Sequence, residues 1–115
     1  MNDDVYWFPG TLEELSSFET SVKGRLGFTL RMVQNGMNPD NVSPFRGPIK
    51  ELKAAGRDSE FRLAFVAYPE TTYVLHVFKK DTHGGLAVPD KIRRLIMDRA
   101  KQAEQMHAAH LKGRR

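Results

Sequence analysis

The residues best suited to chemistry lie in one short segment, EFRLAFVAYPETTYVLHVFKK, which spans residues 60–80. Arg62 stands in its first apolar run, His76 lies within the second, and Lys79 and Lys80 end it. An arginine can hold a phosphate or carboxylate with two hydrogen bonds, and a lysine adds a point charge. A histidine transfers protons near neutral pH. Together these residue types suit an anion site that supports acid–base chemistry.

The two apolar runs predict a β-hairpin over residues 61–78, joined by a proline turn. With a three-residue loop, Arg62 lies opposite Phe78, and Arg62, His76 and Lys80 share one face. A two-residue loop would instead place Lys79 beside Arg62. Either register gathers at least two cations, which repel one another unless an anion lies between them. The other face forms the core: Phe61, Leu63, Phe65, Ala67, Tyr73, Leu75 and Val77.

Each of these residues, taken alone, also has an ordinary structural interpretation. Arg62 could pair with a nearby acid such as Glu60 or Asp58, and His76 could be a hydrogen-bonded sheet histidine. The two lysines could be a solvated strand end. The convergence of all of them on one hairpin is what favours an anion site.

Other kinds of chemical site have little support in the sequence. Cysteine is absent, which excludes a disulfide framework, a thiol nucleophile and a cysteine zinc site. His107 and His110 are the only histidines with a spacing that could suit zinc, but they fall in the fraying end of a predicted helix, so we discount them. His83-Gly84-Gly85 is too short for a phosphate-binding glycine loop. We therefore expect no metal and no cofactor.

Composition and charge place the chain in a broad class. Its 115 residues, 40% hydrophobic and 28% charged, are typical of one folded domain over residues 1–115. No apolar stretch is long enough to cross a membrane, and the acidic start MNDDVYWFPG is unlike a signal peptide, so we expect a cytoplasmic protein. Residues 1–45 carry a formal charge of −3 and residues 46–115 a charge of +7. This asymmetry favours a polyanionic partner, either nucleic acid or an acidic protein segment.

The elements that would position the hairpin alternate between helix and strand. A short strand over residues 5–8 precedes a helical hairpin over about 11–36, where Thr11 and Glu14 have capping-box spacing. Turn-forming residues predict an exposed loop over 37–48, followed by a weak strand over 49–54. An amphipathic helix is predicted from about 89 to 110. The predicted order, β-α-α-β-β-β-α, indicates an α+β fold in which the helical hairpin packs on a small antiparallel sheet.

This arrangement resembles the RelE/ParE superfamily of bacterial toxins, and especially its HigB-like, phage-associated branch. The most specific pieces are Phe61-Arg62 opening one strand and LHVFKK, residues 75–80, closing the next. The segment LAVPD, residues 86–90, and the helix after it extend the likeness, which covers residues 5–106. The resemblance implies a type II toxin that cleaves mRNA on the ribosome. It also implies a cognate antitoxin, usually one with a helix-turn-helix domain.

The resemblance also implies roles for individual residues. Arg62 matches the strand arginine that contacts the scissile phosphate, and Lys80 matches the basic residue that ends the last strand. His76 lies on the same face, where a base or acid could act. Lys53 matches a basic position of the family, while Glu51 stands where some members have a second lysine. A catalytic tyrosine found in some members just after the last strand has no match here.

That missing tyrosine leaves His76 or His83 as the candidate general base. The remaining cations would hold RNA: Lys53, Arg57, Lys79 and the basic side chains of the last helix. The same fold in the ParE branch poisons DNA gyrase without cutting RNA, so fold alone does not decide the activity. A nucleic-acid-binding module with a decayed catalytic set is a third possibility.

Overall fold

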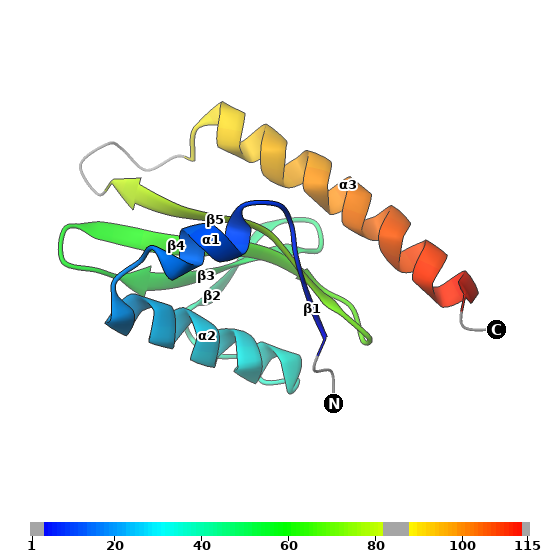
Figure 1. The fold of residues 1–115 in the computed structure, drawn as a ribbon, viewed down its shortest axis with the longest axis horizontal. Coiled ribbons are helices and arrows are strands. Elements are labelled where there is room, and N and C mark those ends of the chain that lie inside the picture. The colour runs from blue at the N-terminus through cyan, green and yellow to red at the C-terminus, as the bar shows by residue number, and fades with distance from the viewer. Residues whose placement is uncertain (1–3, 82–87, 114–115) are drawn as a thin grey trace.

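The computed structural model describes residues 4–81 and 88–113 and contains three helices and five strands in that part of the chain (Figure 1). In chain order the elements are β1 (Val5–Trp7), α1 (Thr11–Ser16), α2 (Thr20–Gln34), β2 (Val42–Arg46), β3 (Ile49–Ala55), β4 (Ser59–Ala67), β5 (Thr72–Asp81) and α3 (Asp90–Gly113). The predicted α+β class is confirmed.

The strands form one five-stranded sheet in the order β1-β5-β4-β3-β2. All neighbouring pairs are antiparallel except β1 and β5, which are parallel. The sheet is therefore mixed, whereas the sequence predicted an antiparallel one. The α1–α2 segment lies between β1 and the other strands along the chain, and this long connection allows β1 to return parallel to β5.

The predicted loop over 37–48 is wrong in part, because β2 forms within it. β2 is an edge strand, and its register against β3 shifts between Pro44 and Arg46. Proline is tolerated in such a place, since an edge strand need not donate every backbone hydrogen bond. Gly47, with φ of 56°, makes the tight turn into β3. The segment does contain many turn-forming residues, but its middle pairs with β3 and so becomes part of the sheet.

The helical hairpin covers one face of the sheet, as predicted. The buried residues of this hairpin-side cluster are Leu15, Phe18, Val22, Leu26, Leu30, Leu52, Ala54, Phe61, Leu63, Phe65, Val74 and Val77. The predicted capping box is wrong, however. Gly10, with φ of 85°, is the N-cap of α1 and no side chain caps this helix. Thr11 is already helical, and its hydroxyl donates to the carbonyl of Phe8 at 2.7 Å.

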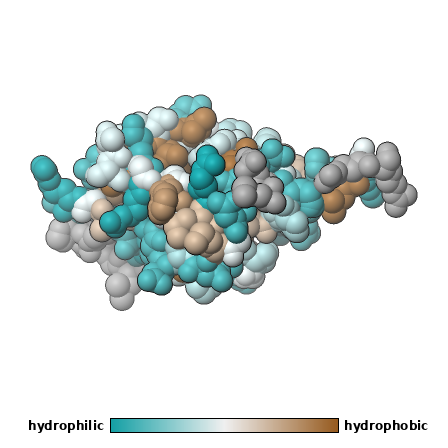
Figure 2. Space-filling view, turned by 90° about the horizontal axis from the view of Figure 1, so that it is seen from below, coloured by the Kyte–Doolittle hydropathy of each residue, from teal (hydrophilic) through white to brown (hydrophobic). Residues whose placement is uncertain are grey.

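The opposite face of the sheet is partly covered by α3, which runs across it as a separate layer (Figure 1). The buried residues of this α3-side cluster are Phe8, Ile49, Ala64, Val66, Tyr73, Leu75, Phe78, Val88, Ile96 and Ala103. The surface on the side where α2 lies is mostly hydrophilic, with small separate hydrophobic patches (Figure 2). The most exposed large hydrophobic residue in the described part of the chain is Phe28 of α2, at 68%.

A bulge in the central hairpin changes which residues face which layer. Arg62 pairs with Phe78 and Ala64 with His76, as a three-residue loop predicts, but the next pair is Phe65 with Val74. Leu75 is the extra residue, so the alternation of β5 inverts there. Tyr73 and Leu75 consequently pack on the α3 side, not with Val77 as predicted. Ala67, also predicted in the core, is exposed.

Candidate functional site

Most of the predicted site residues lie on the sheet face that α3 partly covers. Lys53 pairs directly with Arg62, whose partner on the other side is Phe78. Glu60 pairs with Lys80, and Ala64 pairs with His76, one step further along the same face. Three strands therefore bring Lys53, Arg62, Lys80 and His76 together, because cross-strand partners point the same way.

The other predicted residues lie elsewhere. Lys79 pairs with Phe61, which belongs to the hairpin-side cluster, so Lys79 is exposed on the opposite face of the sheet. Arg57 is exposed in the turn between β3 and β4. His83 falls outside the described residues. The structure thus separates Lys79 from the cationic group that it was predicted to join.

Arg62 is held by two carboxylates. Its Nε donates to Glu60 Oε1 at 2.6 Å, and its Nη2 lies 2.6 Å from the same oxygen. Its Nη1 lies 3.5 Å from Glu51 Oε1, and only 11% of the arginine side chain is exposed. The cations of this face were predicted to repel one another unless an anion lies between them, and at Arg62 two carboxylates of the chain itself, Glu60 and Glu51, supply negative charge.

Glu51 is a site residue that sequence reasoning passed over. It is buried on β3, and its pKa is raised above the ordinary value of 4.5 because burial disfavours the charged form. Arg62, Lys53 and Lys80 oppose this rise, while Glu60 adds to it. Alternation along IKELKA does place Glu51 and Lys53 on one face. The alternation in the sequence therefore indicated the face on which Glu51 lies. Only the register between β3 and β4 shows that this face brings it next to Arg62.

His76 stands on β5 beside a groove. Its ring is half-buried and stacks on Phe78 with centroids 5.3 Å apart. Its pKa is lowered from the ordinary 6.5, first by burial and then by the positive charge of Arg99. At neutral pH the imidazole is therefore neutral and can accept a proton.

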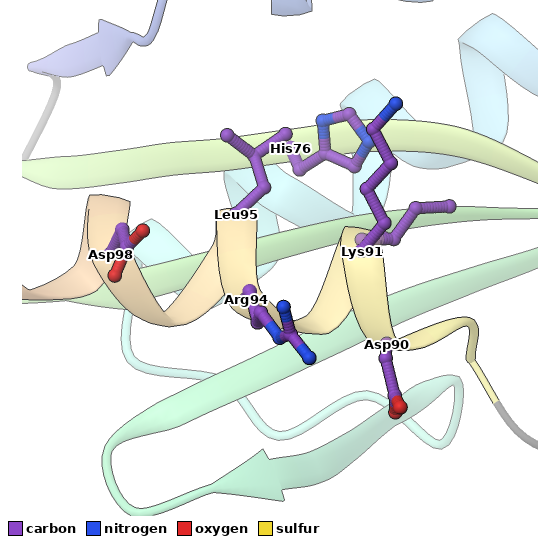
Figure 3. Close-up of a pocket in the computed structure, with 7 residues that line it drawn as sticks. His76, Asp90, Lys91, Arg94, Leu95 and Asp98 are labelled. Atoms are coloured by element: carbon purple, nitrogen blue, oxygen red, sulfur yellow. The ribbon is translucent and has the colours of Figure 1, made fainter.

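The groove has a volume of about 940 Å³ and lies between β5 and the first turns of α3. Figure 3 shows Lys91 and Leu95 rising from α3 on the side of His76, while Arg94 and Asp90 extend away from it. The remaining lining residues are Ile92 and Asp98. The lining thus combines the apolar side chains of Ile92 and Leu95 with two cations, Lys91 and Arg94, and two carboxylates, Asp90 and Asp98.

A family model, described as Phage derived protein Gp49-like (DUF891), matches residues 13–103. This chain belongs to the Gp49-like family. The match covers most of α1, all of α2, strands β2 to β5 and the first part of α3, and so includes every described residue of the candidate site.

The fold of this Gp49-like chain is that of a known toxin. A solved structure of a mutant of the E. coli toxin RelE, in the free state, superposes with a TM-score of 0.58 at 15% sequence identity. The match covers 86% of this chain and 98% of that one. No curated protein sequence matches. The family and the fold together confirm the predicted resemblance to the RelE superfamily.

Some basic residues of the Gp49-like chain have structural roles. Arg99 is one of the basic side chains of the last helix, which were predicted to hold RNA, yet it donates to the carbonyl of Leu75 at 2.8 Å and to that of Pro9 at 3.1 Å. It therefore ties α3 to β5 and to the segment before α1. Arg93 lies over the ring of Phe45 at 6.0 Å. The two hydrogen bonds of Arg99 therefore give this cation a structural role.

Two further findings concern residues 4–81 and 88–113. No group of three or more histidine, aspartate or glutamate side chains there is arranged to hold a metal ion. None of the helices in those ranges combines the length and apolar character needed to span a membrane.

Proposed function

We propose that this protein is the toxin of a type II toxin-antitoxin system and cleaves mRNA on the ribosome. The observation that carries the proposal is one sheet face on which three cations, Lys53, Arg62 and Lys80, lie beside two proton-transfer groups, His76 and Glu51. Membership of the Gp49-like family and the RelE fold support it.

The proposed reaction uses the RNA as its own nucleophile. The 2′-hydroxyl attacks the adjacent phosphate, so the protein needs no covalent intermediate. It needs a base near the 2′-oxygen, an acid for the leaving 5′-oxygen and positive charge for the phosphate oxygens. In this proposal Arg62 clamps the phosphate, Lys80 and Lys53 stabilise the developing charge, and His76 is the base.

The ion pairs of Arg62 bear directly on how RNA would bind. A phosphate that reaches the guanidinium must compete with Glu60, whose side chain is 34% exposed, and with the buried Glu51. Glu60 can swing into solvent because it lies at the edge of the network. In the free protein, Arg62 is then paired with carboxylates of its own chain. When RNA binds, its phosphate replaces the Glu60 carboxylate at the guanidinium.

The same ion pairs also favour a second candidate. An arginine neutralised within its own chain is what a protein that no longer binds a scissile phosphate would contain. A ParE-like gyrase poison or a decayed nucleic-acid-binding module would fit that observation. The neutral His76 on the same face as Arg62 favours the ribonuclease, since neither alternative needs a proton-transfer group.

An antitoxin partner follows from the proposal. The basic C-terminal half of the chain suits an acidic partner segment, and the antitoxin is expected to carry a helix-turn-helix domain. RNA held through phosphate contacts on the same face would bind more weakly as salt rises.

Induced expression in a bacterial host tests the proposal, with growth and mRNA 5′ ends followed together. Arg62→Ala is the test variant, and Arg25→Ala, at an exposed arginine on α2, is the matched control. Growth arrest with new 5′ ends inside translated frames, lost in Arg62→Ala and kept in Arg25→Ala, is the expected result. Arrest with intact mRNA would point to the gyrase poison. No arrest from a folded product would point to the decayed module.

A further inference from the structure

A second pocket lies at the other end of β5 from Lys80. It has a volume of about 560 Å³ and lies where the start of β1, the β4–β5 turn and the second half of α3 meet (Figure 1). Its lining includes Asp4, Tyr6, Thr71, Tyr73, Met106 and His110. Tyr73 and Lys80 lie near opposite ends of β5, which at ~3.3 Å per residue are roughly 20 Å apart. The pocket is therefore separate from the cationic face.

Two tyrosine rings form part of this pocket. Tyr6 and Tyr73 are partners in the parallel pairing of β1 with β5, and their ring centroids lie 5.8 Å apart with the planes at 45°. Tyr73 is buried, whereas Tyr6 is 41% exposed. The face of an aromatic ring carries partial negative charge, so an exposed ring beside an open volume attracts a cation.

Contacts outside the pocket hold these rings in place. His107 is buried and stacks on Tyr68 with centroids 4.1 Å apart, and its ring lies at 80° to that of Tyr73, 6.4 Å away. Tyr6 meets the ring of Phe8 edge-on at 5.2 Å. A site whose side chains are already ordered loses little conformational entropy when a ligand enters.

The charge around the pocket is negative. Among the described residues that line it, Asp4 supplies a carboxylate and none is a lysine or an arginine. Glu70 lies nearby, with its Oε1 3.8 Å from His107 Nε2. Burial raises the pKa of Tyr73, and the negative charge of Glu70 adds to this rise, so the field of that carboxylate reaches the pocket. These surroundings favour a cationic ligand and disfavour the phosphates of a nucleic acid.

Arginine is the cation that suits these groups best. Its guanidinium is planar, so it can stack on a tyrosine ring, and it can donate two hydrogen bonds to one carboxylate. A lysine ammonium would act only as a point charge. The pocket volume is within the usual range for ligand sites, so it holds an arginine side chain.

We propose that this pocket is a docking site for an arginine side chain in a basic segment of a protein partner. The guanidinium stacks on Tyr6 and pairs with Asp4. Free arginine carries the same guanidinium, but its own carboxylate is repelled by Asp4, so an arginine within a peptide is the better ligand. The site does not depend on the proposed ribonuclease function, because it lies away from the cationic face.

An NMR titration of the isotope-labelled protein tests the proposal. The probes are a capped Gly-Arg-Gly peptide, the same peptide with citrulline in place of arginine, and free arginine. Citrulline keeps the shape of arginine without its charge. Asp4→Asn is the test variant, because Asp4 is exposed and its backbone carbonyl still accepts from the Thr72 N–H. Glu13→Gln, exposed on α1, makes the same change in net charge and is the matched control.

The expected result is a saturable shift of the Tyr6, Thr71 and Tyr73 amides with the arginine peptide, with a dissociation constant on the order of 1 mM. Asp4→Asn should raise this constant about fivefold, the effect of one exposed ion pair, and Glu13→Gln should leave it unchanged. The citrulline peptide should cause no saturable shift of these amides. Binding of the arginine peptide should weaken as salt rises.

Other results would overturn the proposal. Equal binding of the citrulline peptide, or an unchanged constant in Asp4→Asn, would show that the pocket does not recognise the charge. No saturation by about 50 mM arginine peptide would show that it does not take this side chain. Tighter binding of free arginine would make it a small-molecule site, and a short RNA that shifts the same amides would make it a nucleic-acid site. None of these measurements involves RNA cleavage, so their outcome is independent of the proposed function.

Discussion

Neutralising Glu60 should make RNA bind more tightly. Glu60 Oε1 takes both the Nε and the Nη2 of Arg62 at 2.6 Å, so it occupies the edge of the guanidinium that would otherwise hold a phosphate. In Glu60→Gln the charge that competes with the phosphate is gone, while the side chain keeps its size. Arg62 remains in place because Glu51 still contacts its Nη1.

The size of the effect follows from the exposure of the pair. The Glu60 side chain is 34% exposed, so solvent screens its ion pair with Arg62. The free energy of this pair is therefore ~1 kcal/mol, the upper end of the range for surface ion pairs. Removing that competition should lower the dissociation constant about fivefold, since 1.4 kcal/mol corresponds to a factor of ten.

The assay is fluorescence anisotropy with a labelled RNA whose scissile 2′-hydroxyl is replaced by hydrogen, at fixed ionic strength. Glu13→Gln makes the same change in net charge at an exposed position on α1, so it reports the general gain in attraction. The reasoning is refuted if Glu60→Gln binds this RNA no more tightly than Glu13→Gln does. Arg62 would then not be the group that receives the phosphate.

Three other outcomes are expected. His76→Gln should slow cleavage ~10²–10⁴-fold while ribosome binding, followed by sedimentation, is unchanged; lost binding would contradict a role as base. The pKa of Glu51 is raised in the native state above its ordinary value of 4.5. Between these two pKa values the native state therefore binds more protons than the unfolded state does. The free energy of unfolding in urea should therefore fall as pH rises through this window, and Glu51→Gln should remove this contribution; an unchanged slope would contradict the burial of a titrating carboxyl. Gly10→Ala should destabilise the fold by ~1 kcal/mol because φ is 85° there, whereas Gly24→Ala, with open space at the added Cβ inside α2, should stabilise it by up to ~1 kcal/mol. Urea midpoints that shift in the same direction would refute that pair.

Much of the fold could be predicted because local patterns determine it. Apolar spacing indicated α2 and α3 to within a few residues, and alternation indicated β4 and β5. β2 was missed because its residues have turn propensity and become a strand only by pairing with β3. The parallel pairing of β1 with β5 was missed for the same reason, since no local signal records the return of a distant segment.

The only part of the candidate site that could be predicted is the part that follows from the register of the β4–β5 hairpin. That register placed Arg62 and His76 on a common face, and the structure has the same pairs there. The bulge at Leu75 was not predictable, because the turn-proximal pairs are set by packing against α3. Lys79 was grouped with the site because two registers were open, and the observed one sends it to the other face.

The sequence by itself determined which residue types could do chemistry here and which strands carry them, because alternation and propensity are properties of neighbours in the chain. Only the tertiary structure decided the electrostatic state of that site. The pairing of β3 with β4 brings Glu51 under Arg62, and burial then raises the carboxyl pKa. Coulombic and desolvation effects act through space, so a charge that reads as a free cation in the chain can be a paired one in the fold.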